Sequence, residues 1–69
     1  MLTIGKTIKK YRMDRELKMT DIQRELGISA GVQSQWESDA RVPNLLTLWE
    51  LADYYNVSLD ELVGRVQSK

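Results

Sequence analysis

The chain has 69 residues, of which 42% are hydrophobic, and its ten basic residues balance ten acidic ones. A chain this short buries only about 60% of its unfolded surface, so it has room for one core and one domain spanning residues 1–69. The absence of cysteine and histidine excludes a disulfide framework and an ordinary zinc site, and no apolar stretch approaches the ~20 residues that cross a bilayer.

Charge is distributed unevenly along the chain. Residues 1–18 hold six basic and two acidic residues (+4), whereas residues 19–69 hold four basic and eight acidic ones (−4). A local basic surface is therefore compatible with the neutral total. Residues 1–15 contain no apolar block, which does not fit a signal peptide, and we expect a cytoplasmic protein. The sequence indicates no metal, cofactor, membrane or small-molecule ligand.

Spacings of three and four residues between apolar side chains predict five short helices and no strand. The first two cover about residues 3–15 and 19–26, and Gly27 follows at the position where a left-handed residue costs least. The third covers about residues 30–38, after Ser29, whose side chain can cap it.

The fourth helix spans about residues 45–55, with Asn44 as its cap. The fifth opens on a capping box, in which the side chains of Ser58 and Glu61 bond each other's free backbone donors. The residues expected in the core share one face of each helix: Ile4, Ile8, Tyr11, Met19, Ile22, Leu26, Ile28, Val32, Trp36, Leu45, Leu48, Leu51, Ala52, Tyr55, Leu59, Leu62 and Val63. The predicted fold is a compact all-α five-helix bundle.

The second and third helices, joined through Leu26-Gly27-Ile28-Ser29, have the form of a helix-turn-helix. The glycine allows a tight turn, Ile28 fills the angle between the helices, and Ser29 begins the second one. Such a unit presents the N-terminal half of residues 30–38 as a rod that fits a DNA major groove. Many structural helix pairs also contain Leu-Gly, so the turn alone leaves a DNA-binding and a structural role equally open.

Several short motifs occur in a specific order and spacing. They are Ile4-Gly5, Tyr11-Arg12, Leu26-Gly27-Ile28-Ser29, Trp36-Glu37, Arg41-Val42-Pro43, Leu51-Ala52-Asp53 and Val57-Ser58-Leu59-Asp60-Glu61-Leu62. In these motifs the chain resembles, from about Ile4 to Gly64, the phage-repressor/Cro-like (xenobiotic-response-element type) helix-turn-helix family. The resemblance implies a lambda-repressor-like fold with the helix-turn-helix at the second and third helices. It also implies sequence-specific binding of double-stranded DNA by a homodimer, most often in repression.

The resemblance also implies DNA contacts for particular residues. The base-reading positions are Ala30, Gly31, Ser34 and Gln35. Gln35 is the most informative, because its amide can pair with adenine in a bidentate way that discriminates by about 1–3 kcal/mol. The phosphate-contact positions are Lys18, Met19, Thr20, Ser29, Ser38 and Arg41. Met19 stands where the family commonly has a glutamine, so one side-chain contact is lost.

For the other charged residues we expect mainly structural or long-range electrostatic roles. The resemblance implies an ion pair between Arg12 and Glu37 that ties the first helix to the end of the third. For Arg41, an alternative to phosphate contact is an ion pair with Glu37 or with Asp39. The exposed lysines of the first helix are expected to act only through long-range steering: Lys6, Lys9 and Lys10.

Two glutamines depart from the family pattern, which has a small residue at Gln23 and isoleucine or valine at Gln33. One hypothesis is that their amides hydrogen-bond to each other, since a buried amide without a partner costs about 1–3 kcal/mol. In the alternative, Thr20-Asp-Ile-Gln23 is itself a capping box that begins the second helix at Thr20. Val32 would then turn toward the core and Gln33 toward DNA. We prefer the family register.

Large apolar residues at Leu46 and Trp49, with Tyr54 nearby, occupy positions that are often polar in the family. They are either ordinary exposed side chains or a dimer interface. The absence of histidine, cysteine and a glycine-rich phosphate loop argues against an enzyme. The leading prediction is a DNA-binding transcriptional repressor that reads a palindromic operator. The alternative is a protein-interaction module of the same fold, such as an antitoxin or regulator partner domain, with weak DNA affinity.

Overall fold

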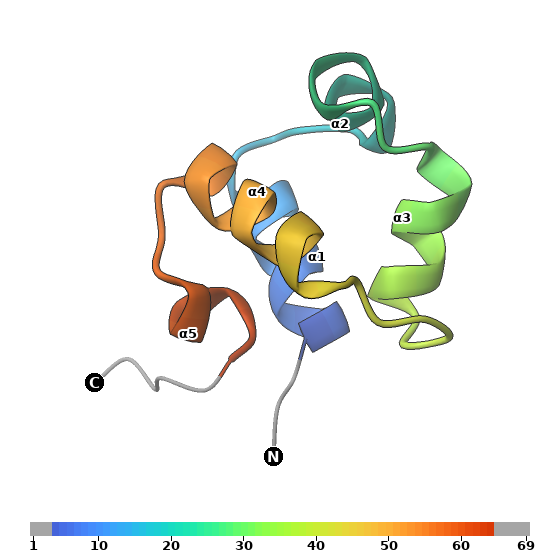
Figure 1. Ribbon diagram of the computed structural model, residues 1–69. Coiled ribbons are helices and arrows are strands. Elements are labelled where there is room, and N and C mark those ends of the chain that lie inside the picture. Colours follow the sequence, from blue (N-terminus) through green and yellow to red (C-terminus); the bar gives the residue numbers. More distant parts are fainter. Residues whose placement is uncertain (1–3, 65–69) are drawn as a thin grey trace.

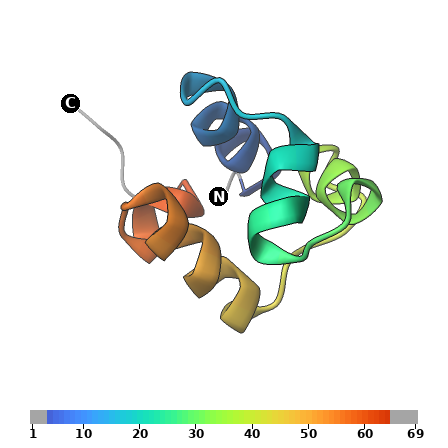
Figure 2. The same cartoon turned by 90° about the horizontal axis from the view of Figure 1, so that it is seen from above.

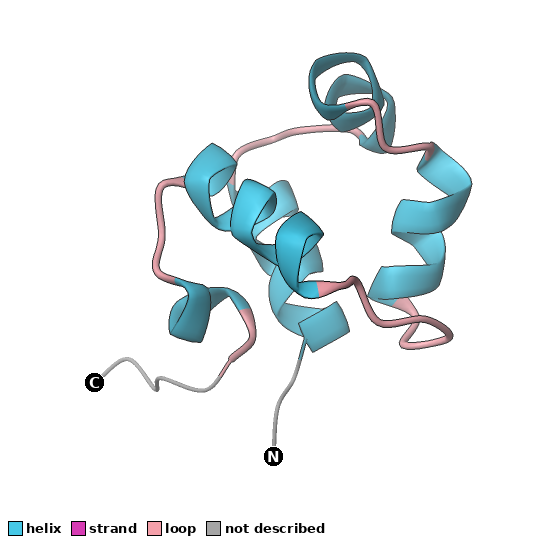
Figure 3. Cartoon of the chain, in the orientation of Figure 1, coloured by secondary structure: helices cyan, strands magenta, loops and turns pink. Residues whose placement is uncertain are grey.

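The computed structural model describes residues 4–64, which form five helices joined by loops (Figures 1 and 3). The helices are α1 (Ile4–Asp14), α2 (Met19–Leu26), α3 (Ala30–Glu37), α4 (Leu45–Tyr55) and α5 (Leu59–Leu62). No strand occurs between residues 4 and 64. The predicted all-α fold is confirmed; the predicted helix start at Thr3 lies outside the described residues. None of the described helices is long and apolar enough to span a membrane.

Local capping interactions fix the helix ends as predicted. The side chains of Ser29 and Asn44 each accept a hydrogen bond from the backbone N–H three residues later. At the start of α5, the hydroxyl of Ser58 accepts from the Glu61 N–H at 3.0 Å, and the Glu61 carboxylate accepts from the Ser58 N–H, also at 3.0 Å. Gly27 ends α2 with φ 74° in the left-handed region, where glycine has no steric cost.

All five helices contribute to one core. In the view from above, α4 and α5 form one side of the molecule, and α2 and α3 form the other (Figure 2). The buried apolar residues of this core are Ile8, Ile22, Trp36, Leu48, Leu51, Ala52, Tyr55 and Leu62. Two predicted core residues lie outside this core. Met19 is only half-buried and is not packed against it, and Leu45 is 60% exposed. Its spacing from Leu48 places it on the inner edge of α4, but it belongs to the first turn, where no neighbouring helix covers it.

Gly5 allows a close approach between α1 and the end of α3. A Cβ atom at this position would collide with the backbone oxygen of Trp36 and with the Asp39 carboxylate. The Gly5 N–H instead donates to Asp39 Oδ1 at 3.2 Å. Asp39 lies just after α3 with φ 64°, a left-handed conformation that aspartate tolerates better than most residues. This contact fixes the position of α3 relative to α1.

Candidate nucleic-acid interface

The two unusual glutamines hold the helix-turn-helix together, but not through each other. Gln33 is only 3% exposed, and its amide nitrogen donates to Met19 O at 2.8 Å and to Ile28 O at 2.9 Å. Gln23 is exposed, and its side-chain oxygen accepts from the Ala30 N–H at 3.1 Å. The hypothesis of a Gln23–Gln33 pair is therefore wrong: Gln33 ties the start of α2 to the turn, and Gln23 caps α3.

The alternative register is also wrong. The N-cap residue of α2 is Lys18, and Asp21 Oδ2 accepts the Lys18 N–H at 2.8 Å. Asp21 thus has the role that the alternative capping box gave to Gln23. The hydrogen bond from the Lys18 backbone lowers the pKa of the Asp21 carboxyl. α2 begins at Met19, as the family register predicts, and a negative charge lies beside its first turn.

A buried ion pair fixes α3 from the side of α1. Arg12 Nε donates to Glu37 Oε2 at 2.7 Å and Nη2 donates to Oε1 at 3.0 Å, which is the bidentate geometry that guanidinium and carboxylate favour. The two side chains are only 14% and 7% exposed. The hydrogen bond with Glu37 raises the pKa of Arg12. Arg12 Nη1 also donates to Leu17 O at 2.9 Å, so this cation belongs to the scaffold.

Arg15 is a second basic residue that the fold uses. Its guanidinium lies 5.3 Å from the ring centroid of Tyr11 and 5.0 Å from that of Tyr55, within the range of cation–π attraction. Its Nη2 donates to Tyr55 O at 2.6 Å. The sequence did not reveal this role, because Tyr55 is 40 residues away along the chain. The positive charge of the first 18 residues is therefore only partly available to a ligand.

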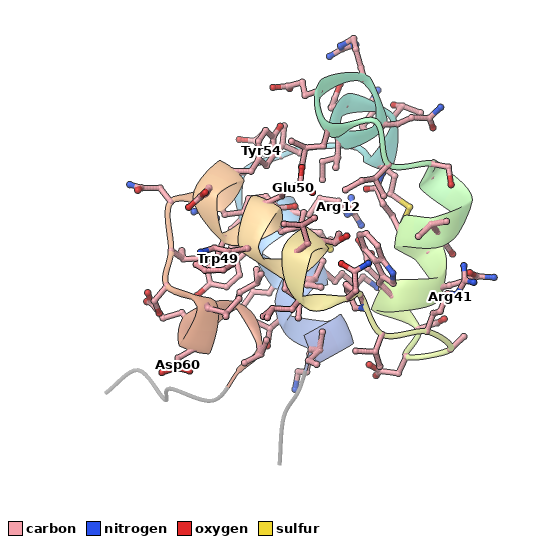
Figure 4. The ribbon with its side chains drawn as sticks, in the orientation of Figure 1. Arg12, Arg41, Trp49, Glu50, Tyr54 and Asp60 are labelled. Atoms are coloured by element: carbon pink, nitrogen blue, oxygen red, sulfur yellow. The ribbon has the colours of Figure 1, made fainter. Side chains whose placement is uncertain are left out.

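The predicted base-reading residues lie on the outer side of α3. Gly31, Ser34 and Gln35 are exposed and Ala30 is partly buried. Beside them, Arg41 points outward from the loop after α3 (Figure 4). Arg41 Nη1 donates to Gln35 Oε1 at 3.5 Å, which is the outer limit of a hydrogen bond. The outer face of α3 thus combines one amide and one cation with small side chains.

Arg41 is not held by an acidic partner in the described part of the chain. Neither of the ion pairs formed within residues 4–64, Arg12–Glu37 and Arg24–Asp21, includes it. The alternative in which Arg41 pairs with an acidic neighbour is therefore not the arrangement of this structure. Its charge remains exposed to solvent.

A groove borders the outer face of α3 on each side. The first, which we term the connector groove, measures about 560 Å³ and includes Ser29, Val32, Trp36, Arg41, Pro43 and Asn44. The second, termed the α1 groove, measures about 320 Å³ and is lined by Lys9, Arg12, Met19, Ser34, Glu37 and Ser38. The predicted phosphate-contact positions are therefore divided, with Ser29 and Arg41 on one side and Met19 and Ser38 on the other.

The exposed residues of α4 do not all lie together. Leu46 and Trp49 are 69% and 57% exposed, and Leu45 adds a third apolar side chain at 60%. Tyr54 lies elsewhere on α4, half-buried, and its hydroxyl donates to Glu25 Oε2 at 3.0 Å (Figure 4). The exposed apolar face of α4 therefore consists of Leu45, Leu46 and Trp49, and Tyr54 packs toward α2 instead.

Comparisons with known proteins agree with this geometry. A family model described as helix-turn-helix matches residues 8–62. The chain is 33% identical over 64 residues to the HTH-type transcriptional regulator ImmR of Bacillus subtilis (strain 168). The aligned region covers 93% of this chain and 50% of ImmR. It also matches the crystal structure of a transcriptional regulator from Listeria innocua with a TM-score of 0.86 and 26% identity, over 99% of this chain and 64% of that one.

The chain thus spans about half the length of the curated relative that it matches. Both relatives are named as regulators and not as enzymes. The family match covers most of the chain, including every residue of α2, α3 and α4. This protein belongs to the helix-turn-helix family of the Cro-like, xenobiotic-response-element type.

Proposed function

We propose that the protein is a sequence-specific DNA-binding transcriptional regulator that inserts the outer face of α3 into the major groove. The observation that carries this proposal is that polar contacts fix α3 from within while its outer residues stay exposed. Gln33 and the Arg12–Glu37 pair point inward, whereas Ser34 and Gln35 face solvent. A rigid helix with free polar side chains is what base reading requires. The names of the two relatives support the same role.

Base recognition would centre on Gln35, whose amide can bond N6 and N7 of adenine. Its contact with Arg41 is long, at 3.5 Å, and would be exchanged easily for a base. Ser34 can donate or accept, and Ala30 can contact a thymine methyl group. Gly31 fits a close approach to DNA, because a Cβ there would meet no protein atom within 4 Å. The fold itself therefore does not require this glycine.

Phosphate binding would use both sides of the helix-turn-helix. In the connector groove we assign it to Arg41 and Ser29. At the start of α2 we assign it to Lys18 and to the N–H groups of Met19 and Thr20, which precede the first intrahelical hydrogen bond. The nearby Asp21 carboxylate opposes an anion there, so Arg41 is expected to contribute most. Ser38 is the weakest of the assigned positions, since its hydroxyl donates to the Gln35 carbonyl oxygen at 3.2 Å.

Selection from random duplex DNA, followed by sequencing and titration at several salt concentrations, tests this function. We expect a defined site whose affinity falls steeply as salt rises. Gln35→Ala should relax the sequence preference at one base pair. Arg41→Ala should weaken binding to all duplexes and lower the salt slope of the affinity by about one. Failure to bind any duplex at low salt would contradict the proposal.

We further propose that two copies bind a palindromic operator and repress the adjacent gene. The supporting observation is the α4 apolar face, where Leu45, Leu46 and Trp49 are neighbours and each is more than half exposed. A second copy that packs its own α4 there would remove this apolar surface from water. A reporter gene placed behind the selected site should fall in expression when the protein is present and recover with the Gln35→Ala variant.

A protein-interaction module of the same fold is the second candidate. It is favoured by the absence of basic residues from α3 and by the Asp21 carboxylate at the start of α2, because both weaken attraction to phosphate. This candidate predicts no duplex selected at low salt and capture of a defined protein partner. The selection experiment therefore separates the two functions.

A further inference from the structure

We propose that Lys9 contacts a DNA phosphate from the α1 groove, on the opposite side of α3 from Arg41. This inference rests on the proposed DNA binding and adds a contact from α1, a helix whose lysines were expected to act only at long range. It assigns the α1 groove as a second phosphate-binding surface, next to the outer face of α3.

The position of Lys9 follows from the Arg12–Glu37 ion pair, which lies one helical turn further along α1. Residues three apart are neighbours on a helix surface, so Lys9 lies on the same face of α1 as Arg12. Arg12 is bonded to Glu37 at 2.7 Å and so brings this face of α1 against α3. Accordingly, Lys9 lines one groove together with Ser34 of α3 and with Ser38, which directly follows α3. Ser34 is a base-reading position, so a phosphate beside α3 would approach this groove.

The charges in the α1 groove leave one cation uncompensated. Arg12 and Glu37 neutralise each other within the groove. Lys9 is exposed, and it is in neither of the ion pairs that residues 4–64 form. An ammonium group on a flexible four-carbon stem can reach a nearby phosphate without movement of the backbone.

The hydrogen-bond donors of the groove point to the same residue. Met19 carries no side-chain donor, and the hydroxyl of Ser38 donates to Gln35 O at 3.2 Å. All three guanidinium nitrogens of Arg12 donate within the protein, to Glu37 and Leu17. Ser34 and Lys9 are the groove residues whose side-chain donors form no hydrogen bond within residues 4–64, and of the two only Lys9 carries a positive charge.

The geometry of DNA gives a reason for a cation on each side of α3. A helix in the major groove has a phosphate backbone along both of its flanks. Arg41 lies in the connector groove and Lys9 in the α1 groove, so each would face a different backbone. Two such contacts would fix the helix across the groove, whereas one cation alone would hold only one side.

The experiment compares two lysines of the same helix. Lys10 is exposed like Lys9, but it is two residues from Arg12 and therefore on another face of α1. Binding of the selected duplex and of a scrambled duplex is measured at several salt concentrations for Lys9→Gln, Lys9→Arg and Lys10→Gln. Thermal unfolding of each variant verifies that the fold is retained.

Lys9→Gln should weaken binding to both duplexes and lower the salt slope by about 0.9. The ratio of the parent's affinity to the variant's then changes about 3.5-fold between 50 and 200 mM salt. Lys9→Arg should keep the parent slope, and Lys10→Gln should keep it as well. An unchanged salt slope for Lys9→Gln, or an equal decrease of the slope for Lys10→Gln, overturns the assignment of Lys9 but leaves the proposed function standing. If the parent protein binds no duplex, both this inference and the proposed function are wrong.

Discussion

The inner side of α3 and the outer side of α4 depart from the usual division of polar and apolar residues in opposite ways. Beneath α3, Gln33 is 3% exposed, and the side chains of Arg12 and Glu37 are 14% and 7% exposed. On α4, Leu46 and Trp49 are 69% and 57% exposed. Polar groups are therefore buried in one region, and large apolar side chains are in water in the other.

The difference is that the buried polar groups have partners within the described residues, whereas the exposed apolar side chains are not covered by them. The Gln33 amide nitrogen and the Arg12 guanidinium have hydrogen-bond partners, as buried polar groups need. Leu45, Leu46 and Trp49 have no comparable cover within residues 4–64. Buried polar groups with partners stabilise and orient a helix, whereas a group of exposed apolar residues is typical of an interface. The first region therefore acts as scaffold, and we propose that the second is a binding surface.

The largest effect should come from breaking the buried ion pair. Glu37→Ala leaves the Arg12 guanidinium, which is 14% exposed, without its carboxylate. We expect a loss of about 3 kcal/mol in the free energy of unfolding, measured by urea denaturation. Arg24→Ala is the control, because its pair with Asp21 is exposed at the arginine and should contribute little. Equal effects of the two substitutions would remove the distinction between buried and exposed pairs.

The α4 apolar face is tested by assembly. Trp49→Ser should weaken dimer formation by about 2 kcal/mol or more, because tryptophan at the centre of an interface carries much of the binding energy. Met13→Ser is a matched control, since Met13 on α1 is exposed to the same extent, 57%. Sedimentation equilibrium gives the association constants. A parent protein that remains monomeric would contradict the role of this face.

Replacing the buried amide should have an intermediate effect. Gln33→Val is expected to lower the free energy of unfolding by about 1–3 kcal/mol, since Met19 O and Ile28 O lose their donor. Gln35→Val, two residues later on the exposed face, should change stability much less. Chemical denaturation of both variants gives the comparison. A more stable Gln33→Val protein would show that the amide is not part of the scaffold.

The smallest effect at neutral pH concerns a buried polar group that has no partner among the described residues, the Tyr55 hydroxyl. Burial raises the pKa of Tyr55 to about 12, against about 10 in the unfolded chain. The folded state thus binds the proton more tightly, and this contribution to stability is present below pH 10 and lost toward pH 12, at up to about 1.4 kcal/mol per pH unit.

Tyr55→Phe should therefore be at least as stable as the parent at neutral pH, because it removes a buried hydroxyl without a partner. It should also lose less stability than the parent as the pH rises above 10. Urea midpoints measured at neutral and at alkaline pH give both quantities. A clear loss of stability at neutral pH would mean that the hydroxyl has a partner that holds it in the fold.

Much of the fold could be predicted from local pattern. The helix ends at Ser29, Asn44 and Ser58 follow from side chains that bond backbone groups three residues away, so the sequence contains both partners of each interaction. The left-handed Gly27 follows in the same way. The ion pair of Arg12 with Glu37 was expected from the resemblance, and the structure contains it. Its partners are 25 residues apart, and local pattern alone would not have joined them.

The errors concern contacts between distant elements. Leu45 has the spacing of a core residue, but spacing does not tell whether a neighbouring helix reaches the first turn of α4. The Gln23–Gln33 pair followed from the resemblance, in which these two positions lie opposite each other, yet each amide bonds a backbone group instead. The placement of Lys9 in a groove with α3 residues was likewise not visible in the sequence, since it depends on how α1 packs.

The sequence by itself determined that this protein is a small all-α domain without histidine or cysteine, and that it carries a helix-turn-helix. These properties depend on composition, on apolar spacing and on caps, which act within one or two helical turns. The tertiary structure decided how the neutral total of ten basic and ten acidic residues is distributed in space. Arg12 and Arg15 became part of the scaffold, whereas Lys9 and Arg41 lie beside α3 without an ion-pair partner in residues 4–64. Which charges are available to a ligand depends on packing between helices, because only packing brings a distant carboxylate or aromatic ring to a given cation.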